Sequence, residues 1–210
     1  MVLNRNVTLL AVALVAVGLA GFWAYTRIAP QSDDAFAQCR ASAVAGGSAT
    51  IGGPFTLVDE NGATVTDQDV LGSTPALLYF GYTYCPDVCP LDAARNAEAV
   101  ALLDERGYDV LPVFISIDPE RDTPEVLKEF TDYLHPRMLG LTGTPEQTDA
   151  ASKAFRTYYR KQEGDPEYYL MDHSTFSYLT LPERGFVEFF RRDLPAEQMA
   201  DRMACFLDAM

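Results

Sequence analysis

Two cysteines, Cys85 and Cys89, stand four residues apart in the segment GYTYCPDVCP at 81–90. An apolar run at 76–80 precedes them, so the pattern predicts a strand, a turn and the start of a helix. If that helix begins near Pro86, both side chains lie on one helical face, because residues i and i+4 overlap there. Two sulfurs so placed can form a disulfide or hold one soft metal ion. The competing interpretation is a pair of buried structural cysteines.

The N-terminal segment indicates a protein that is exported and held at a membrane. Residues 7–25 include no charged side chain and would span about 28 Å as a helix, close to the hydrocarbon thickness of a bilayer. We therefore predict a short cytoplasmic stretch at 1–6, a single transmembrane anchor at 7–25, a linker at 26–50 and one domain at 51–210. The domain would face the periplasm from the inner (cytoplasmic) membrane, or the mitochondrial intermembrane space in a eukaryote. A cleavable signal peptide is the alternative to the anchor.

The charge balance excludes one class of partner. The 210 residues include 30 acidic and 16 basic side chains, which gives a net charge of −14. Nucleic acid is bound by basic surfaces, so we expect no nucleic-acid partner. The simplest interpretation of the negative charge is solubility.

The pattern of apolar runs predicts one α/β domain after residue 51. Strands and helices alternate through its middle part, and a hairpin and a helix end the chain. The expected strands cover 54–58, 64–66, 76–80, 110–117, 138–141, 174–181 and 186–191, and the expected helices cover 90–106, 124–134, 145–160 and 195–207. With two cysteines at the first strand-to-helix turn, this order is typical of the thioredoxin-like fold.

Only one of the two histidines has surroundings that suggest a ligand. His173 lies just before the predicted terminal hairpin, which in a thioredoxin topology enters the sheet near the edge that carries the cysteines. A structural role is the more common one for a lone histidine, and it stays open at this point. His135, which precedes Pro136 at the end of a predicted helix, is interpreted as structural.

Three motifs make the sequence resemble the Sco/SenC family, membrane-tethered proteins with a thioredoxin fold that take part in maturing the copper centre of cytochrome oxidase. The motifs are GYTYCPDVCP at 81–90, IDPERDTP at 117–124 and DHS at 172–174. The resemblance covers the chain from about residue 51 to the C-terminus and includes the single N-terminal anchor.

The resemblance implies a set of ligands for copper. Cys85, Cys89 and His173 occupy its copper-ligand positions, and Asp118 lies on a loop near the metal. Cu(I) prefers soft sulfur and accepts low coordination, so two thiolates and one imidazole suit it. Whether Cu(II) is also held stays open. The thiols must be reduced to bind, so oxidation to a disulfide would release the ion.

Two functions of different classes are compatible with these residues. A copper metallochaperone would load from an upstream copper donor and deliver the ion to the copper-site subunit of cytochrome c oxidase, at its dinuclear CuA centre. A thiol-disulfide reductase would instead keep the cysteines of that centre reduced, with Cys85 attacking, Cys89 resolving and an upstream thiol reductant restoring both. His173 distinguishes the two, because metal capture needs the imidazole and reduction does not. A thiol peroxidase would need Ser or Thr where Tyr82 stands.

The family motifs leave two cysteines over, Cys39 and Cys205. In an exported protein, unpaired thiols could exchange with the Cys85 and Cys89 pair or capture copper at the wrong place, so we predict a structural disulfide between Cys39 and Cys205. Four cysteines allow three pairings, and a free buried Cys205 with an exposed Cys39 is the alternative.

Overall fold

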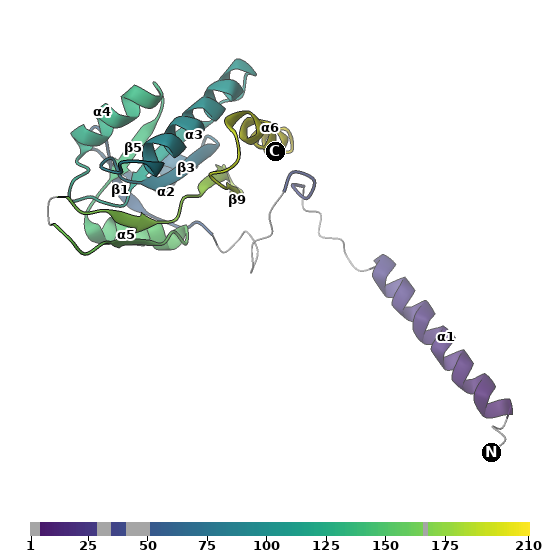
Figure 1. The fold of residues 1–210 in the computed structure, drawn as a ribbon. Coiled ribbons are helices and arrows are strands. Elements are labelled where there is room, and N and C mark those ends of the chain that lie inside the picture. Colours follow the sequence, from purple (N-terminus) through teal and green to yellow (C-terminus); the bar gives the residue numbers. More distant parts are fainter. Residues whose placement is uncertain (1–4, 29–34, 41–50, 166–167) are drawn as a thin grey trace. The chain divides into compact units, whose positions relative to one another are not determined.

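The computed structural model describes residues 5–28, 35–40, 51–165 and 168–210, which separate into two compact units that divide between Ala35 and Phe36. The first unit holds helix α1 (Arg5–Ile28), and the second holds every other described element (Figure 1). Among the described residues, no helix combines the length and the apolar character needed to cross a membrane. The predicted anchor is therefore not confirmed. The predicted stretches 1–6 and 26–50 lie largely outside the described residues.

The second unit is built on a seven-stranded sheet with the strand order β2-β1-β5-β4-β3-β8-β9. β3 pairs in parallel with β4, and β4 with β5, while β8 and β9 add antiparallel strands beside β3. The strands are β1 (Thr56–Asp59), β2 (Thr64–Thr66), β3 (Ala76–Gly81), β4 (Leu111–Ser116), β5 (Leu139–Thr142), β8 (Ser177–Leu181) and β9 (Gly185–Phe190). A separate two-stranded sheet joins β6 (Tyr159–Lys161) to β7 (Met171–His173).

Five helices accompany the two sheets in this unit: α2 (Asp67–Leu71), α3 (Val88–Glu105), α4 (Pro124–Leu134), α5 (Pro145–Ala154) and α6 (Ala196–Asp208). Thr123 caps α4 and Thr144 caps α5, each by accepting a backbone N–H, and a proline follows each cap as expected at a first helical position. The mixed sheet, its helices and the cysteines at the β3–α3 turn confirm the predicted thioredoxin-like fold.

The central strand β3 is buried on both faces, and this places the site at its end. Leu77 packs into one apolar cluster with α3 and α6, while Leu78 and Phe80 pack into a second cluster that also includes Cys85 and Cys89. Alternate residues of a strand point to opposite faces, so a continuous apolar run is what a strand covered on both sides requires. The turn that follows β3 therefore starts from a rigid strand.

One predicted helix ends earlier than expected. The pattern predicted a helix over 145–160, but α5 ends at Ala154 and β6 begins at Tyr159. Arg156 adopts a φ of 54° in the left-handed region, which no helix continues through. The β-forming residues after it, Thr157 to Tyr159, were the available signal.

Cys39 and Cys205 form a disulfide across 166 residues, with their Cα atoms 5.7 Å apart. This is one of the three pairings that the four cysteines allow, and Cys85 and Cys89 remain free. Phe36 packs beside the bond with its ring centroid 5.5 Å from that of Phe206 on α6. The segment around Cys39, which lies inside the predicted linker, is thus attached to α6 by the disulfide and by the packing of Phe36.

Candidate metal centre

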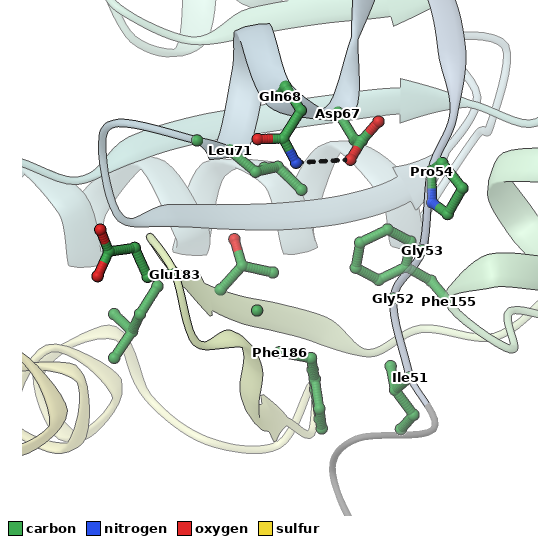
Figure 2. Close-up of a pocket in the computed structure, with 14 residues that line it drawn as sticks. Ile51, Gly52, Gly53, Pro54, Asp67, Gln68, Leu71, Phe155, Glu183 and Phe186 are labelled. Atoms are coloured by element: carbon green, nitrogen blue, oxygen red, sulfur yellow. Dashed lines mark hydrogen bonds between the residues drawn. The ribbon is translucent and has the colours of Figure 1, made fainter.

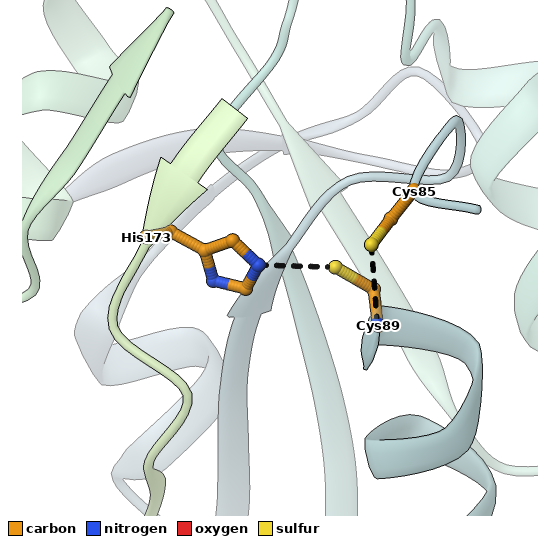
Figure 3. Close-up of side chains that lie close together, drawn as sticks. All are labelled: Cys85, Cys89 and His173. Atoms are coloured by element: carbon orange, nitrogen blue, oxygen red, sulfur yellow. Dashed lines mark hydrogen bonds between the residues drawn. The ribbon is translucent and has the colours of Figure 1, made fainter. Parts of the chain in front are cut away.

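Cys85 lies in a tight turn rather than on a helix. Its backbone N–H donates to the carbonyl of Tyr82 at 3.3 Å and closes a turn after β3, which we call the 82–85 turn. α3 begins only at Val88, so the expectation that both cysteines share a helical face is wrong. Cys89 does lie in the first turn of α3, and its backbone N–H donates to Cys85 Sγ at 3.3 Å (Figure 3). A backbone N–H that has no partner within α3 therefore donates to the sulfur of Cys85.

His173 approaches the cysteines from β7, the strand that pairs with β6 (Figure 3). Its Nε2 lies 3.2 Å from Cys89 Sγ, and its Nδ1 lies 2.8 Å from the carbonyl oxygen of Ser174. Because a carbonyl can only accept, Nδ1 carries the hydrogen and Nε2 faces the thiols with its lone pair. The rings of Tyr79 and Tyr82 lie nearly perpendicular to the imidazole, at centroid distances of 6.2 and 6.0 Å. The imidazole is thus oriented as a metal ligand.

These three side chains form a donor set for a soft metal. One ligand atom from each of Cys85, Cys89 and His173 lies within 4.8 Å of the others, and the described ranges contain no other such group of three or more Cys, His, Asp or Glu residues. Cys89 is fully buried and Cys85 is 8 % exposed, while His173 is half-buried. Two sulfurs and one neutral imidazole fit Cu(I) better than a hard cation.

The two sulfurs differ in their affinity for a proton. The pKa of Cys85 is lowered, chiefly because the Cys89 thiol donates a hydrogen bond to it, and the nearby His173 and the backbone N–H groups of Asp87 and Cys89 lower it further. The pKa of Cys89 is raised, first by that same hydrogen bond to Cys85 and then by burial. The pair therefore holds one negative charge, on Cys85.

This asymmetry predicts the pH dependence of Cys85 alkylation. A lowered pKa keeps the thiolate populated as the pH falls, so the alkylation rate of Cys85 should change little between pH 8 and pH 6. An ordinary cysteine, with a pKa of about 8.5, would lose about tenfold in rate for each unit over most of that range. Mass spectrometry of the iodoacetamide-treated reduced protein measures the rate at each thiol, and the urea-unfolded protein is the control. A tenfold loss for each unit at Cys85 would contradict the assignment.

Asp118 lies in the loop after β4, and its carboxylate accepts hydrogen bonds from other side chains of the protein. Its carboxylate accepts from Tyr169 Oη at 2.7 Å and from Arg121 Nε at 2.5 Å. The Arg121 guanidinium in turn lies over the Tyr169 ring at 3.6 Å and over the Tyr84 ring at 4.8 Å. Asp118 therefore belongs to a cation–aromatic cluster beside the turn that carries Cys85 and is no member of the donor set.

Sequence reasoning missed the residues that hold the donor set in place. Tyr82 Oη accepts the backbone N–H of Met171, two residues before His173, at 3.2 Å. Asp122 accepts from Thr83 in the turn that carries Cys85. Each lies within a motif of the family resemblance, but the contacts join positions far apart along the chain, and spacing alone does not reveal them.

Two other features lie away from this centre. A pocket of about 380 Å³ is lined by Ile51–Pro54, α2 and the β8–β9 turn (Figure 2). It lies at the opposite end of β3, because Thr180 in its wall pairs with the first residue of that strand, Ala76. His135 is buried, and its Nδ1 accepts the backbone N–H of Arg137. Neither feature contacts the three donors.

The SCO1/SenC family model matches residues 43–208. The chain belongs to the SCO1/SenC family. Protein SenC of Rhodobacter capsulatus is 55 % identical over 208 residues, which cover 99 % of this chain and 92 % of that protein. The mitochondrial SCO1 homolog 1 of Arabidopsis thaliana is 42 % identical over 156 residues, which cover 74 % of this chain and 46 % of that protein.

Solved structures of Sco proteins show the same fold. The copper-bound ScoI of Arabidopsis thaliana superposes with a TM-score of 0.73 at 40 % identity, over 76 % of this chain and 99 % of that one. Copper-bound yeast Sco1 superposes with a TM-score of 0.71 at 35 % identity, over 77 % of this chain and 90 % of that one. Both Sco relatives hold copper, and the Cys-Cys-His group of this chain fits the same metal.

Proposed function

We propose that this protein is a copper metallochaperone. It binds one Cu(I) ion through Cys85, Cys89 and His173 and hands the ion to the copper-site subunit of cytochrome c oxidase, at the CuA centre. The observation that carries the proposal is the convergence of two sulfurs and one lone-pair nitrogen within 4.8 Å. The copper-bound Sco relatives support the choice of metal.

The site suits capture and release of a cargo ion. Cys85 already carries the charge that a thiolate ligand needs, and only the Cys89 proton must leave when the ion enters. Three protein donors leave a Cu(I) ion open to a fourth, incoming ligand, so an acceptor thiolate or imidazole can bind before the first donors dissociate. His173 is the most exposed of the three donors.

Replacement of His173 by alanine tests the metal role. We expect the Cu(I) affinity to fall at least about tenfold, since one of three ligands is lost, while the dithiol and any disulfide reduction persist. Competition against a chromogenic Cu(I) chelator measures the affinity. His135→Ala removes the other histidine of the chain and is the matched control, which should bind copper as the wild type does. Unchanged copper retention in His173→Ala would remove the main support for the proposal.

A second candidate, thiol-disulfide reduction, is favoured by the lowered pKa of Cys85 beside a buried Cys89. The Cys85 thiolate would attack one sulfur of a target disulfide, and the other target sulfur would leave as a thiolate. Cys89, after losing its proton, would attack Cys85 in the mixed disulfide, form the Cys85–Cys89 bond and release the second target thiolate. An upstream thiol reductant would return two electrons to the pair. A peptide with the two cysteines of the oxidase copper site, supplied as a disulfide, is the substrate for this assay.

Membrane attachment completes the proposal. An uncharged run at 7–25 supports a single-pass anchor, with the copper-binding domain in the periplasm or the mitochondrial intermembrane space. Extraction of membranes with alkaline carbonate decides it: an anchored chain stays in the pellet, and release of the full-length chain would contradict the anchor.

A further inference from the structure

Asp122 is a fully buried carboxylate that accepts three hydrogen bonds from two elements. Ser116 Oγ donates to it at 2.6 Å from the end of β4. Thr83 donates twice, from its backbone N–H at 3.2 Å and from its hydroxyl at 2.6 Å. Since all three partners are donors, the arrangement suits an ionised carboxylate, which only accepts. Asp122 thus joins the loop after β4 to the turn after β3.

Thr83 occupies a decisive position in that turn. It is the second residue of the 82–85 turn, which the bond from Cys85 N–H to the Tyr82 carbonyl closes. On the other side of the turn, Tyr82 Oη accepts the backbone N–H of Met171 on the strand of His173. The turn is therefore held between Asp122 and β7, and the position of Cys85 Sγ depends on both attachments.

We propose that Asp122, through Thr83, is a positioning residue of the copper site. It holds both donors of Thr83, which fixes the 82–85 turn and places Cys85 Sγ where the N–H of Cys89 donates to it and where it can share an ion with Cys89 and His173. This inference rests on the proposed copper function and deepens it. A donor atom that is already in place costs less to order when the ion binds, so the affinity is higher.

The charged neighbours of Asp122 do not replace Thr83 in this role. Burial is the main reason why the pKa of Asp122 is raised, and the nearby carboxylate of Asp118 raises it further. Arg121 donates to Asp118 and lies over tyrosine rings. The partners of Asp122 are therefore the uncharged donors of Thr83 and Ser116.

A second carboxylate offers a matched comparison elsewhere in the fold. Glu60 Oε2 accepts the Thr131 hydroxyl and the backbone N–H of Gly140, each at 2.8 Å. It too joins separate elements through a threonine hydroxyl and a backbone N–H. Gly140 lies on β5, two strands away from β3. Loss of the Thr131 hydroxyl should therefore affect stability alone.

The test compares Thr83→Val with Thr83→Ser and Thr131→Val. Thr83→Val keeps the shape and removes one hydrogen bond to Asp122, so we expect about tenfold weaker Cu(I) binding in chelator competition. We also expect a higher pH midpoint for Cys85 alkylation in the metal-free protein, since the N–H groups that donate to Sγ lose their alignment. Thr83→Ser keeps the hydroxyl and should restore both values. Thr131→Val should lower the melting temperature and change neither value.

The outcomes separate this inference from the function on which it rests. Wild-type protein that binds no copper would refute the proposed function, and the alkylation midpoints of the Thr83 variants would still decide the role of Asp122. Wild-type values in Thr83→Val would overturn the inference. So would an equal loss in Thr83→Ser, or in Thr131→Val, because the effect would then follow from stability rather than from the position of Cys85.

Discussion

Replacement of Cys85 or Cys89 by serine should abolish tight Cu(I) binding. A serine hydroxyl is a hard donor that stays protonated at neutral pH, so each change leaves one sulfur and one imidazole for a soft ion. The loss should exceed that of the His173 variant, since sulfur contributes most to the Cu(I) affinity. Metal analysis of the reduced protein after gel filtration should give one copper per chain for the wild type and a value near zero for either variant.

The other two cysteines provide the matched control for this experiment. A Cys39→Ser/Cys205→Ser double variant also loses two sulfurs, but these belong to the disulfide that joins Cys39 to Cys205 on α6 and not to the donor set. It should bind one copper. Equal stoichiometry in the wild type and in the Cys85 and Cys89 variants would refute the assignment of the site. Circular dichroism of each variant checks that the fold is retained.

Among the variants proposed, the one that lacks the Cys39–Cys205 disulfide should lose the most unfolding free energy. The bond closes a loop across 166 residues, and the double serine variant should lose about 2 to 5 kcal/mol of unfolding free energy, through the greater entropy of its unfolded chain. Urea unfolding without reductant, followed by circular dichroism, measures the difference in midpoint. The slope of the transition should rise, because the unlinked chain exposes more surface to urea when it unfolds, so the midpoint and the slope together give the difference in free energy.

Packing beside the bond needs its own control. Phe36→Ala removes the ring that lies 5.5 Å from Phe206 and leaves the disulfide intact. It should lower the midpoint through lost apolar burial, whether or not the loop is closed. A double serine variant as stable as the wild type would show that the bond does not stabilise the fold.

Much of the fold could be predicted from the apolar pattern. The run before Cys85 is the buried strand β3, and the helices expected at 124–134 and 195–207 match α4 and α6 to within one residue. Capping residues and prolines gave clear local signals for the starts of α4 and α5. The end of α5 was missed, because nothing about Arg156 itself predicts its left-handed backbone, and the β-forming residues after it were the only sequence signal.

The candidate site was only partly accessible from the sequence. The cysteine spacing indicated a thiol pair, but the helix starts after Asp87, and the turn that places Cys85 depends on Asp122, 39 residues from Thr83. The position of His173 before the terminal hairpin suggested a ligand and left a structural role open, and the family resemblance then favoured the ligand. Its distance from Cys89 is set by the pairing of β6 with β7 and by Tyr82, which are tertiary contacts.

The order in which the chain is synthesised has a consequence for the metal. His173 follows Cys89 by 84 residues, and the strand after it, β8, pairs antiparallel with β3, the strand before Cys85. A growing chain thus exposes both thiols long before the imidazole exists, and the donor set closes only when the C-terminal third has folded back onto β3. The ion can therefore meet all three donors only after the domain has folded. Metal retention then reports on the pairing of β8 with β3, although neither strand carries a ligand.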